Sequence, residues 1–353
     1  MPDDVDLGSS EETSPQAAPI VSFLFLDVGQ GDCTVVIDHE SKQALVVDCP
    51  ANKERVLQRL LCEQGVALDT AIVTHYDSDH SVGVVDLAAS GAARRFASRV
   101  IQHEAPHVAA QYRDLVKAKR RGMELLDVGV GDEGTVGRLR WSLIGPLQDT
   151  ILSAASIAAP ASPARRRNRT SLIVRIEVKF DVVSDGVLPT RSALVAGDAD
   201  SVSWGHQLAA GNELNADLFR WPHHGGELGR GPRSLGARLL QAVAPEAIFI
   251  GVGSTNRYGH PKMEVVDRVR GDSATLYCSE VTELCSLSRE TAAVPCSGTV
   301  RIDVASDGSL VFDPPRREHE RGVIDRWAQP VCMVASAQPA HGVVQLGRGE
   351  VVV

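Results

Sequence analysis

The densest group of reactive side chains in this 353-residue chain is the segment THYDSDH, residues 74–80. It places two histidines and two aspartates on one short loop directly after the apolar run AIV. Imidazole nitrogens and carboxylate oxygens are ligands that zinc, manganese and iron accept in proteins. Four such groups within one loop could face two adjacent ions. A solvated surface turn is the alternative, but this loop follows a buried strand, so we predict metal ligands at His75, Asp77, Asp79 and His80.

Two further segments end apolar runs with groups of the same kind. The run LVAGD ends in Asp198, whose carboxylate could bridge two metal ions, although Gly-Asp turns are also common in loops. The run WPHHGG ends in His223, His224 and two glycines, beginning with Gly225. Because the glycines lack side chains, a ligand could approach the backbone closely. An ordinary pair of surface histidines is the alternative for this segment.

A glycine-rich loop, GSTNRYGHP at residues 253–261, carries the last group of polar side chains. Asn256, Tyr258 and His260 lie on it, just after the apolar run AIFIGVG. Active-site groups are often carried on loops that a rigid scaffold positions. We therefore treat Asn256 and His260 as candidate site residues, with a purely structural loop as the alternative.

Each of these segments follows an apolar run that is typical of a buried strand, so the fold must bring the ends of these runs together. The residues between 52 and 64 have apolar side chains on one helical face and predict a helix. Residues 151–163 are rich in alanine and serine, contain two prolines and predict a mobile loop. The expected strands are 20–29, 33–38, 44–48, 69–75, 171–180, 192–198, 218–224 and 247–253, followed by a hairpin over 299–312.

Taken together, the motifs resemble the metallo-β-lactamase superfamily. More narrowly, they resemble the hydrolase domain of the ComEC-type competence (DNA-uptake) proteins. The resemblance covers about residues 20–312, and its pieces occur in the family's order: FLDVGQGD, VVD, THYDSDH, NRTSLIVRI, LVAGD, WPHHGG and STNRYGHP.

This resemblance implies an α/β fold, the four-layer αβ/βα sandwich with two mixed sheets and the metals at one edge. We expect residues 1–18 to be a disordered tail, 19–313 the metallo-β-lactamase-like hydrolase domain, and 314–353 a C-terminal extension. The disordered tail is expected because it is rich in acidic residues, serine and proline.

The resemblance also implies a ligand set. Asp77 stands where the broader superfamily has a second histidine, and the usual third-motif histidine is absent. Turns of the Pro-x-His-Gly type favour His224 as the last ligand, with His223 and His260 left open as substitutes or proton donors. Asp48, and Asp32 in DVGQGD, would support the ligands from behind. The implied metal ligands are His75, Asp77, Asp79, His80, Asp198 and His224.

The implied chemistry is hydrolysis by a hydroxide held between two divalent ions, zinc or manganese. Asp79 would orient the hydroxide, and His260 or His223 would stabilise charge or protonate the leaving group. We expect four residues to contact the substrate: Asn256, Gly225, Asn168 and Arg169.

Phosphodiester hydrolysis, with DNA as the leading substrate, follows from the same resemblance. The net charge is −9, from 36 basic and 45 acidic residues, which opposes coating of nucleic acid by bulk charge. The arginines between 165 and 169 still suit phosphate recognition. A hydrolase of a small ester, amide or lactam, and a non-catalytic module that binds a partner, remain the alternatives.

The sequence indicates a cytoplasmic protein without membrane contact. No apolar stretch reaches the roughly 18 residues that a membrane helix needs. The N-terminus lacks the apolar core of a secretory signal. The seven cysteines are too few for a disulfide scaffold, and an odd number of them cannot all pair within the chain. The oligomeric state does not follow from the sequence.

Overall fold

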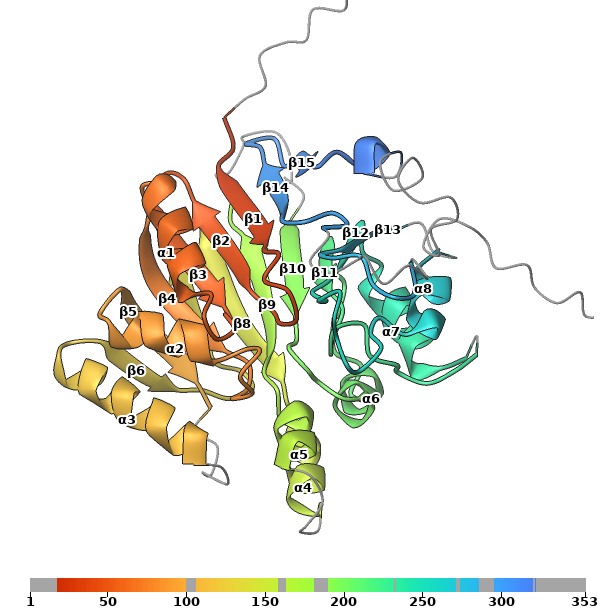
Figure 1. The fold of residues 1–353 in the computed structure, drawn as a ribbon, viewed down its shortest axis with the longest axis horizontal. Helices are drawn as coiled ribbons and strands as arrows, with labels where there is room; N and C mark the ends of the chain where they lie inside the picture. The colour runs from red at the N-terminus through yellow and green to blue at the C-terminus, as the bar shows by residue number, and fades with distance from the viewer. Residues whose placement is uncertain are drawn as a thin grey trace, which may run out of the picture.

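The computed structural model describes residues 18–99, 106–157, 163–180, 190–231, 233–270, 274–285, 295–319 and 321. Two mixed sheets lie face to face, with helices α1–α3 over the outer face of one and α6–α8 over the outer face of the other (Figure 1). This arrangement confirms the predicted four-layer αβ/βα sandwich.

The first sheet has the order β15-β14-β1-β2-β3-β4-β5-β6. Its neighbours are antiparallel from β15 to β3 and parallel from β3 to β6. Its strands are β1 (Val21–Phe25), β2 (Thr34–Asp38), β3 (Gln43–Val47), β4 (Ala67–Val73), β5 (Ala93–Ser98), β6 (Glu124–Asp127), β14 (Val300–Val304) and β15 (Leu310–Asp313).

The second sheet has the order β13-β12-β11-β10-β9-β8-β7. It is antiparallel from β7 to β10 and parallel from β10 to β13. Its strands are β7 (Glu133–Val136), β8 (Leu139–Gly145), β9 (Ile173–Val178), β10 (Arg191–Val195), β11 (Leu218–Arg220), β12 (Ala247–Ile250) and β13 (Thr275–Cys278).

Three apolar clusters hold the four layers together. The central one joins the facing sides of both sheets and includes Phe23 and Val195. The other two lie under the helices: Leu57 of α1 packs in one, and Trp204 of α6 packs in the other. Sheets covered on both faces need strands that are apolar on both faces, which explains the continuous apolar runs in the sequence. The covering helices are α1 (Glu54–Glu63), α2 (Val82–Ala89), α3 (Pro106–Arg120), α6 (Ser201–Ala209), α7 (Leu235–Val243) and α8 (Met263–Arg270).

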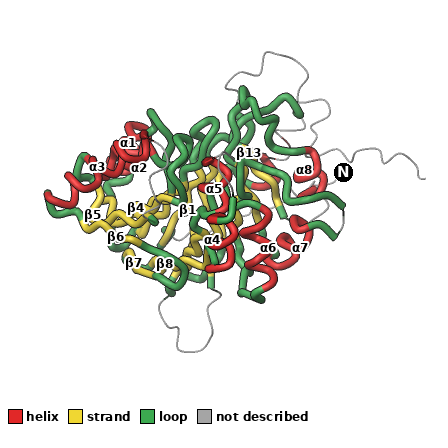
Figure 2. The backbone as a smooth tube through the Cα atoms, turned by 90° about the horizontal axis from the view of Figure 1, so that it is seen from below, coloured by secondary structure: helices red, strands yellow, loops and turns green. Residues whose placement is uncertain are grey.

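Two more helices, α4 (Gln148–Ala155) and α5 (Pro163–Arg169), form an arm that Figure 2 shows between the two groups of covering helices. The prediction of a loop over 151–163 is therefore wrong at its start, and residues 158–162 lie outside the described part. Alanine favours helix strongly. Contact with α6 adds to this, because the Thr150 hydroxyl and His206 Nδ1 lie 2.8 Å apart.

The expected tail and extension lie mostly outside the described residues. Near the N-terminal end of the described residues, the backbone N–H of Ile20 donates to Val304 O at 2.9 Å. At the other end, His319 is buried and its ring stacks on Tyr277 with centroids 4.7 Å apart. The proposed domain boundaries remain a prediction.

Candidate metal centre

The predicted ligands lie on loops that follow the carboxyl ends of four strands. Asp48 follows β3, the loop 74–80 follows β4, Asp198 follows β10, and the histidine pair follows β11. Ligands in open α/β sheets commonly bind beyond the carboxyl ends of strands, because the loops there converge. The candidate site therefore forms where these ends of the two sheets meet.

Asp48 determines which nitrogen two of the histidines present to the site. Its Oδ2 accepts hydrogen bonds from the Thr74 hydroxyl at 2.6 Å and from His80 Nδ1 at 2.9 Å. Because the Thr74 proton is used in this way, Thr74 Oγ1 is left to accept from His75 Nδ1 at 3.1 Å. With both Nδ1 atoms serving as donors, His75 and His80 direct the lone pairs of their Nε2 atoms into the site.

Four donor atoms form a compact group, which we call the inner set: Asp79 Oδ2, His80 Nε2, Asp198 Oδ1 and His224 Nε2. His80 Nε2 lies 3.2 Å from both Asp198 Oδ1 and His224 Nε2. His224 Nε2 lies 3.5 Å from Asp79 Oδ2 and 3.6 Å from Asp198 Oδ1. A tetrahedral ion with ligands at 2.0–2.1 Å requires ligand–ligand separations of about 3.4 Å. Four separations within the inner set, from 3.2 to 3.6 Å, are close to this value, and Asp79 joins the set through His224.

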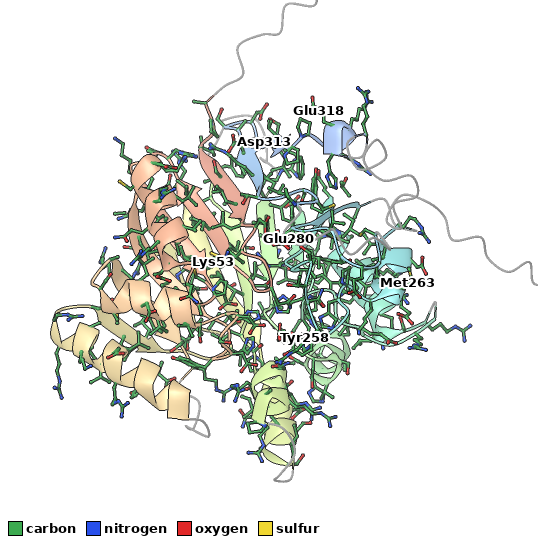
Figure 3. The ribbon with its side chains drawn as sticks, viewed as in Figure 1. Lys53, Tyr258, Met263, Glu280, Asp313 and Glu318 are labelled. Atoms are coloured by element: carbon green, nitrogen blue, oxygen red, sulfur yellow. The ribbon has the colours of Figure 1, made fainter. Side chains whose placement is uncertain are left out.

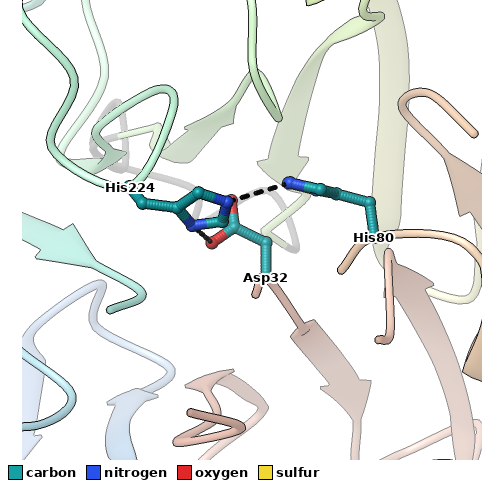
Figure 4. Close-up of side chains that lie close together, drawn as sticks. All are labelled: Asp32, His80 and His224. Atoms are coloured by element: carbon teal, nitrogen blue, oxygen red, sulfur yellow. Dashed lines mark hydrogen bonds and ion pairs between the residues drawn. The ribbon is translucent and has the colours of Figure 1, made fainter. Parts of the chain in front are cut away.

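The inner set also needs a cation on electrostatic grounds. His224 Nδ1 donates to the carbonyl of Gly251 at 2.8 Å, so the neutral ring would present a lone pair on Nε2 to the lone pair of His80 Nε2 (Figure 4). Two facing lone pairs repel unless a proton or a metal ion lies between them. In addition, the buried His75 Nε2 and Asp198 Oδ1 have no hydrogen-bond partner among the residues that the structure describes. The residues present therefore fit a divalent cation.

The pKa values of these groups show how strongly the site attracts positive charge. Burial alone would lower the pKa of His224, but the carboxylates of Asp198 and Asp32 outweigh it and raise this pKa to about 10. Burial is outweighed in the same way at His80, where Asp198 and Asp48 hold the pKa well above its usual value.

A second, looser group of donors, the outer set, surrounds the other oxygen of Asp198. Asp198 Oδ2 lies 3.3 Å from His223 Nδ1 and 3.8 Å from His75 Nε2, which in turn is 3.7 Å from Asp77 Oδ2. The remaining oxygen of Asp77 accepts from Nε of Arg167. The two oxygens of Asp198 thus face two different groups of ligands, as a bridging carboxylate would.

The backbone of the histidine pair explains why both rings reach the same region. His223 and His224 have φ angles of +55° and +53°, in the left-handed region that ordinary residues rarely occupy. Gly225 follows with φ of +83°, and a Cβ at this position would lie 2.5 Å from Cβ of Pro261. Such strain persists only where the surrounding structure enforces it, and it is often found at functional sites.

Behind His224 lies a buried ion pair, of which the sequence predicted one residue and not the other. Nη2 of Arg220 lies 2.7 Å from Oδ1 of Asp32, and both side chains are 2% exposed. Oδ1 of Asp32 is also 3.4 Å from Nδ1 of His224. Asp32 was expected near the ligands, whereas Arg220 was not singled out. Its signal was a single charged residue within the apolar run LFRW.

A cleft of about 750 Å³ opens over both sets. Its lining includes Asp77, Asp79, Asp198 and both histidines, together with residues from the arm and from the loop after β12. Figure 3 places Tyr258 where the arm meets the body of the molecule. Arg167 and Arg257 also line the cleft, so the walls above the acidic floor carry positive charge.

The four residues predicted to contact the substrate have different surroundings. Asn168 lines the cleft, with Nδ2 3.1 Å from Nδ1 of His223. Arg169 turns to Asp200 at 2.9 Å, and on this helix Arg167 is the arginine that contacts Asp77. Gly225 is the left-handed glycine described above.

The amide of Asn256 is bonded to its own loop. Its Nδ2 donates to Gly253 O and His260 O at 2.9 Å, and its Oδ1 accepts from His260 N at 2.7 Å. The amide therefore fixes the loop that carries His260. Burial, and then the neighbouring His223 and His224, lower the pKa of His260 to about 4, so that its ring is neutral at pH 7.

Comparisons with known proteins find similarity to one family model and to one curated relative. The model of the metallo-beta-lactamase superfamily matches residues 26–148. ComE operon protein 3 of Bacillus subtilis (strain 168) is 23% identical over 266 residues, which make up 70% of this chain and 30% of that protein. The chain thus spans less than a third of the length of this curated relative. These matches confirm the resemblance found in the sequence.

Among the solved structures that match the chain are the metallo-beta-lactamase fold protein YhfI from Bacillus subtilis and the metallo hydrolase Igni18 from Ignicoccus hospitalis. YhfI has a TM-score of 0.43 and 12% identity, covering 73% of this chain and 96% of its own. Igni18 has a TM-score of 0.41 and 13% identity, covering 82% of this chain and 98% of its own. Within the described residues, no helix has the length and apolar character needed to cross a membrane.

Proposed function

The chain has the fold of the metallo-β-lactamase superfamily, and from this premise we propose that it is a metal-dependent phosphodiesterase that cleaves nucleic acid. The observation that carries the proposal is the inner set, in which two imidazole lone pairs and two carboxylates converge at the spacing of metal ligands. The similarity to ComE operon protein 3 and the arginines on the walls of the cleft support an anionic substrate.

We assign two divalent ions, zinc or manganese, to this centre. The inner set would hold one ion, and the outer set would hold the other through His75, Asp77 and His223. In this assignment His223 would take the place of the third-motif histidine that the chain lacks, and Asp198, whose two oxygens face the two sets, would serve as a ligand to both ions. Such ions activate water and neutralise phosphate charge.

The reaction is hydrolysis of one P–O ester bond. A water oxygen forms a bond to phosphorus, the ester oxygen leaves, and the two protons of water end on the leaving oxygen and on the surrounding groups or solvent. Asp79, at the open face of the inner set, is suited to orient the water molecule, because its carboxylate lies 3.5 Å from His224 Nε2 and lines the cleft. Burial opposes its charge, but His224 and His80 outweigh burial and lower its pKa to about 2, so it accepts hydrogen bonds at neutral pH.

His260 has a role that its low pKa restricts. A ring with a pKa of about 4 is neutral at pH 7, so it can form hydrogen bonds but carries no second proton to give to a leaving group. We assign it to bind a phosphate oxygen through its N–H. Arg167 and Asn168 flank the same region and would orient the substrate.

The test begins with protein purified without chelator, whose metal content is measured. It is then assayed on bis-p-nitrophenyl phosphate and on single-stranded DNA with added manganese or zinc. We expect Asp79→Ala to abolish cleavage of both, whereas Asp86→Ala, an exposed aspartate on α2, should behave like the wild type. Bound metal without any phosphodiester cleavage would reject the proposal and favour a small ester, amide or lactam as substrate.

A further inference from the structure

A second pocket adjoins the main cleft. It has a volume of about 440 Å³, and three of its lining residues, Asn168, His223 and His260, also line the main cleft. Both volumes fall within the roughly 300–1,000 Å³ that ligand sites occupy. The three shared residues form a common wall next to the outer set, and space for a ligand exists on each side of it.

The common wall contains two buried polar atoms for which the described part of the chain supplies no hydrogen-bond partner. They are Nδ1 of His260, a residue that is 6% exposed, and Oδ1 of Asn168. Buried polar atoms in native proteins nearly always have a partner, so an exception at a cleft indicates a ligand that supplies one. Both atoms belong to residues that face both spaces.

The charges that line the second pocket suit an anionic ligand, as do those of the main cleft. Its two acidic residues are neutralised, because Asp200 pairs with Arg169 and Glu227 pairs with Arg230. Arg165 is exposed and lines the pocket, and among the described residues it has no ion pair. One arginine is therefore available on this side of the wall, and Arg257 is available on the other.

We propose that the two pockets hold the two sides of one phosphodiester, with the phosphate at the common wall. This inference rests on the proposed function and makes its substrate more specific: an internal linkage of a single-stranded nucleic acid. A monoester or a terminal phosphate would leave one pocket empty. A base within a duplex is stacked and paired, and it would have to leave the stack to enter a pocket. After hydrolysis, one pocket holds the fragment with the phosphate and the other holds the fragment with the new hydroxyl group.

The decisive substrates are a circular and a linear single-stranded DNA of the same sequence, compared with manganese-loaded full-length protein. We expect the circle to be cut at a rate close to that of the linear strand, because neither pocket needs a chain end. If linear DNA is shortened only from its ends and the circle stays intact, the inference is wrong and the proposed function stands. If neither DNA nor bis-p-nitrophenyl phosphate is cleaved, the proposed function itself fails.

Two variants test the second pocket directly. Ser201→Trp adds bulk at an exposed lining position, and Arg165→Gln removes the available arginine. For Ser201→Trp, we expect the ratio of circle cutting to hydrolysis of p-nitrophenyl methyl phosphate, a small diester, to fall by up to about 100-fold, the loss that misplacing a substrate by about 1 Å can cause. For Arg165→Gln, we expect a higher KM for DNA and a weaker dependence of KM on salt.

The matched control for bulk is Ala209→Trp, at the exposed last residue of the same helix and outside both pockets. It should keep the wild-type ratio. If the ratio in Ser201→Trp is unchanged, including the case in which both activities fall equally, the pocket does not receive the far side of the diester. Circular dichroism of each variant confirms that the fold is retained.

Discussion

At the scale of single residues, the centre depends on groups that hold the histidines rather than only on the histidines themselves. Asp48 accepts hydrogen bonds from the Thr74 hydroxyl and from His80 Nδ1, and the Gly251 carbonyl accepts one from His224 Nδ1. Each acceptor selects one tautomer and so directs an Nε2 lone pair inward. A ligand set of this kind is pre-arranged for a cation before the cation binds.

Asp48→Asn tests this arrangement. Asp48 has φ of +58°, and asparagine tolerates that backbone conformation well, so the substitution mainly changes the acceptor. In the wild type Oδ1 of Asp48 accepts from the Thr74 backbone N–H at 2.8 Å, and Oδ2 accepts from the Thr74 hydroxyl and His80; the single oxygen of the amide cannot serve both sides, so His80 or Thr74 loses a bond. We expect metal affinity to fall about 10- to 100-fold, measured by competition with a chromophoric chelator. Asp38→Asn, a buried aspartate away from the site, is the control and should keep wild-type affinity.

Metal binding should release protons. At pH 8 the His224 pKa of about 10 keeps this ring protonated in the metal-free protein, and a metal ion requires the neutral ring. His80, whose pKa is also held well above its usual value, must lose its extra proton too, so we expect between one and two protons to be released per ion bound at the inner set, and affinity to weaken as the pH falls. Calorimetry in two buffers of different ionisation enthalpy measures this release. Equal binding enthalpies in the two buffers would contradict it.

At the scale of elements, short loops of unusual backbone geometry bring the ligands together. The left-handed turn after β11 presents two consecutive histidines to one region, which a regular strand would place on opposite faces. The loop after β12 is closed by three hydrogen bonds of Asn256 and carries His260. Contact of Gly225 with Pro261 couples the two loops.

Asn256 variants separate positioning from direct substrate binding. Asn256→Ala removes all three hydrogen bonds of the loop, whereas Asn256→Asp keeps an acceptor for His260 N and loses the two donated bonds. We expect kcat/KM on bis-p-nitrophenyl phosphate to fall about 100-fold in the first variant and less in the second, with metal content unchanged. A rise in KM alone, of equal size in both variants, would instead support direct contact with the substrate.

At the scale of the whole molecule, the buried Arg220–Asp32 pair joins the two sheets beneath the candidate metal centre. Arg220 lies at the end of β11 in the second sheet, and Asp32 lies just before β2 in the first. Nη1 of Arg220 also donates to Cys33 O and Thr34 Oγ1, each at 3.1 Å. A Cβ on Gly251 would lie 2.3 Å from Arg220 Nη2, so this glycine leaves room for the guanidinium.

Arg220→Ala would leave the carboxylate of Asp32 buried without its partner. We expect the free energy of unfolding to fall by about 3–5 kcal/mol, as is typical when one member of a buried ion pair is removed. Urea denaturation measures this change. Arg191→Ala, which breaks a more exposed pair with Asp217, is the control and should cost about 1 kcal/mol or less. A similar small loss for Arg220→Ala would show that water or a shifted group solvates Asp32.

Much of the fold and of the candidate site follows from the sequence alone. The strand-like runs and the helix over 52–64 recur as β1–β4, β9–β12, the β14–β15 hairpin and α1, with ends that differ by a few residues. The layer order was expected only through the family resemblance. Local composition predicts a loop over residues 151–155, which belong to α4, because it holds no information on the contact of this helix with α6.

The types and places of the candidate ligands were determined by the sequence, because each group directly follows an apolar run and the carboxyl ends of such strands converge. Only the tertiary structure decided which atoms meet. In the folded chain, Nε2 of His224 belongs to the inner set and Nδ1 of His223 to the outer set. Arg167, rather than Arg169, contacts Asp77. The tertiary structure also buried Arg220 against Asp32. These choices depend on backbone angles and on partners distant in the chain, which residue spacing does not encode.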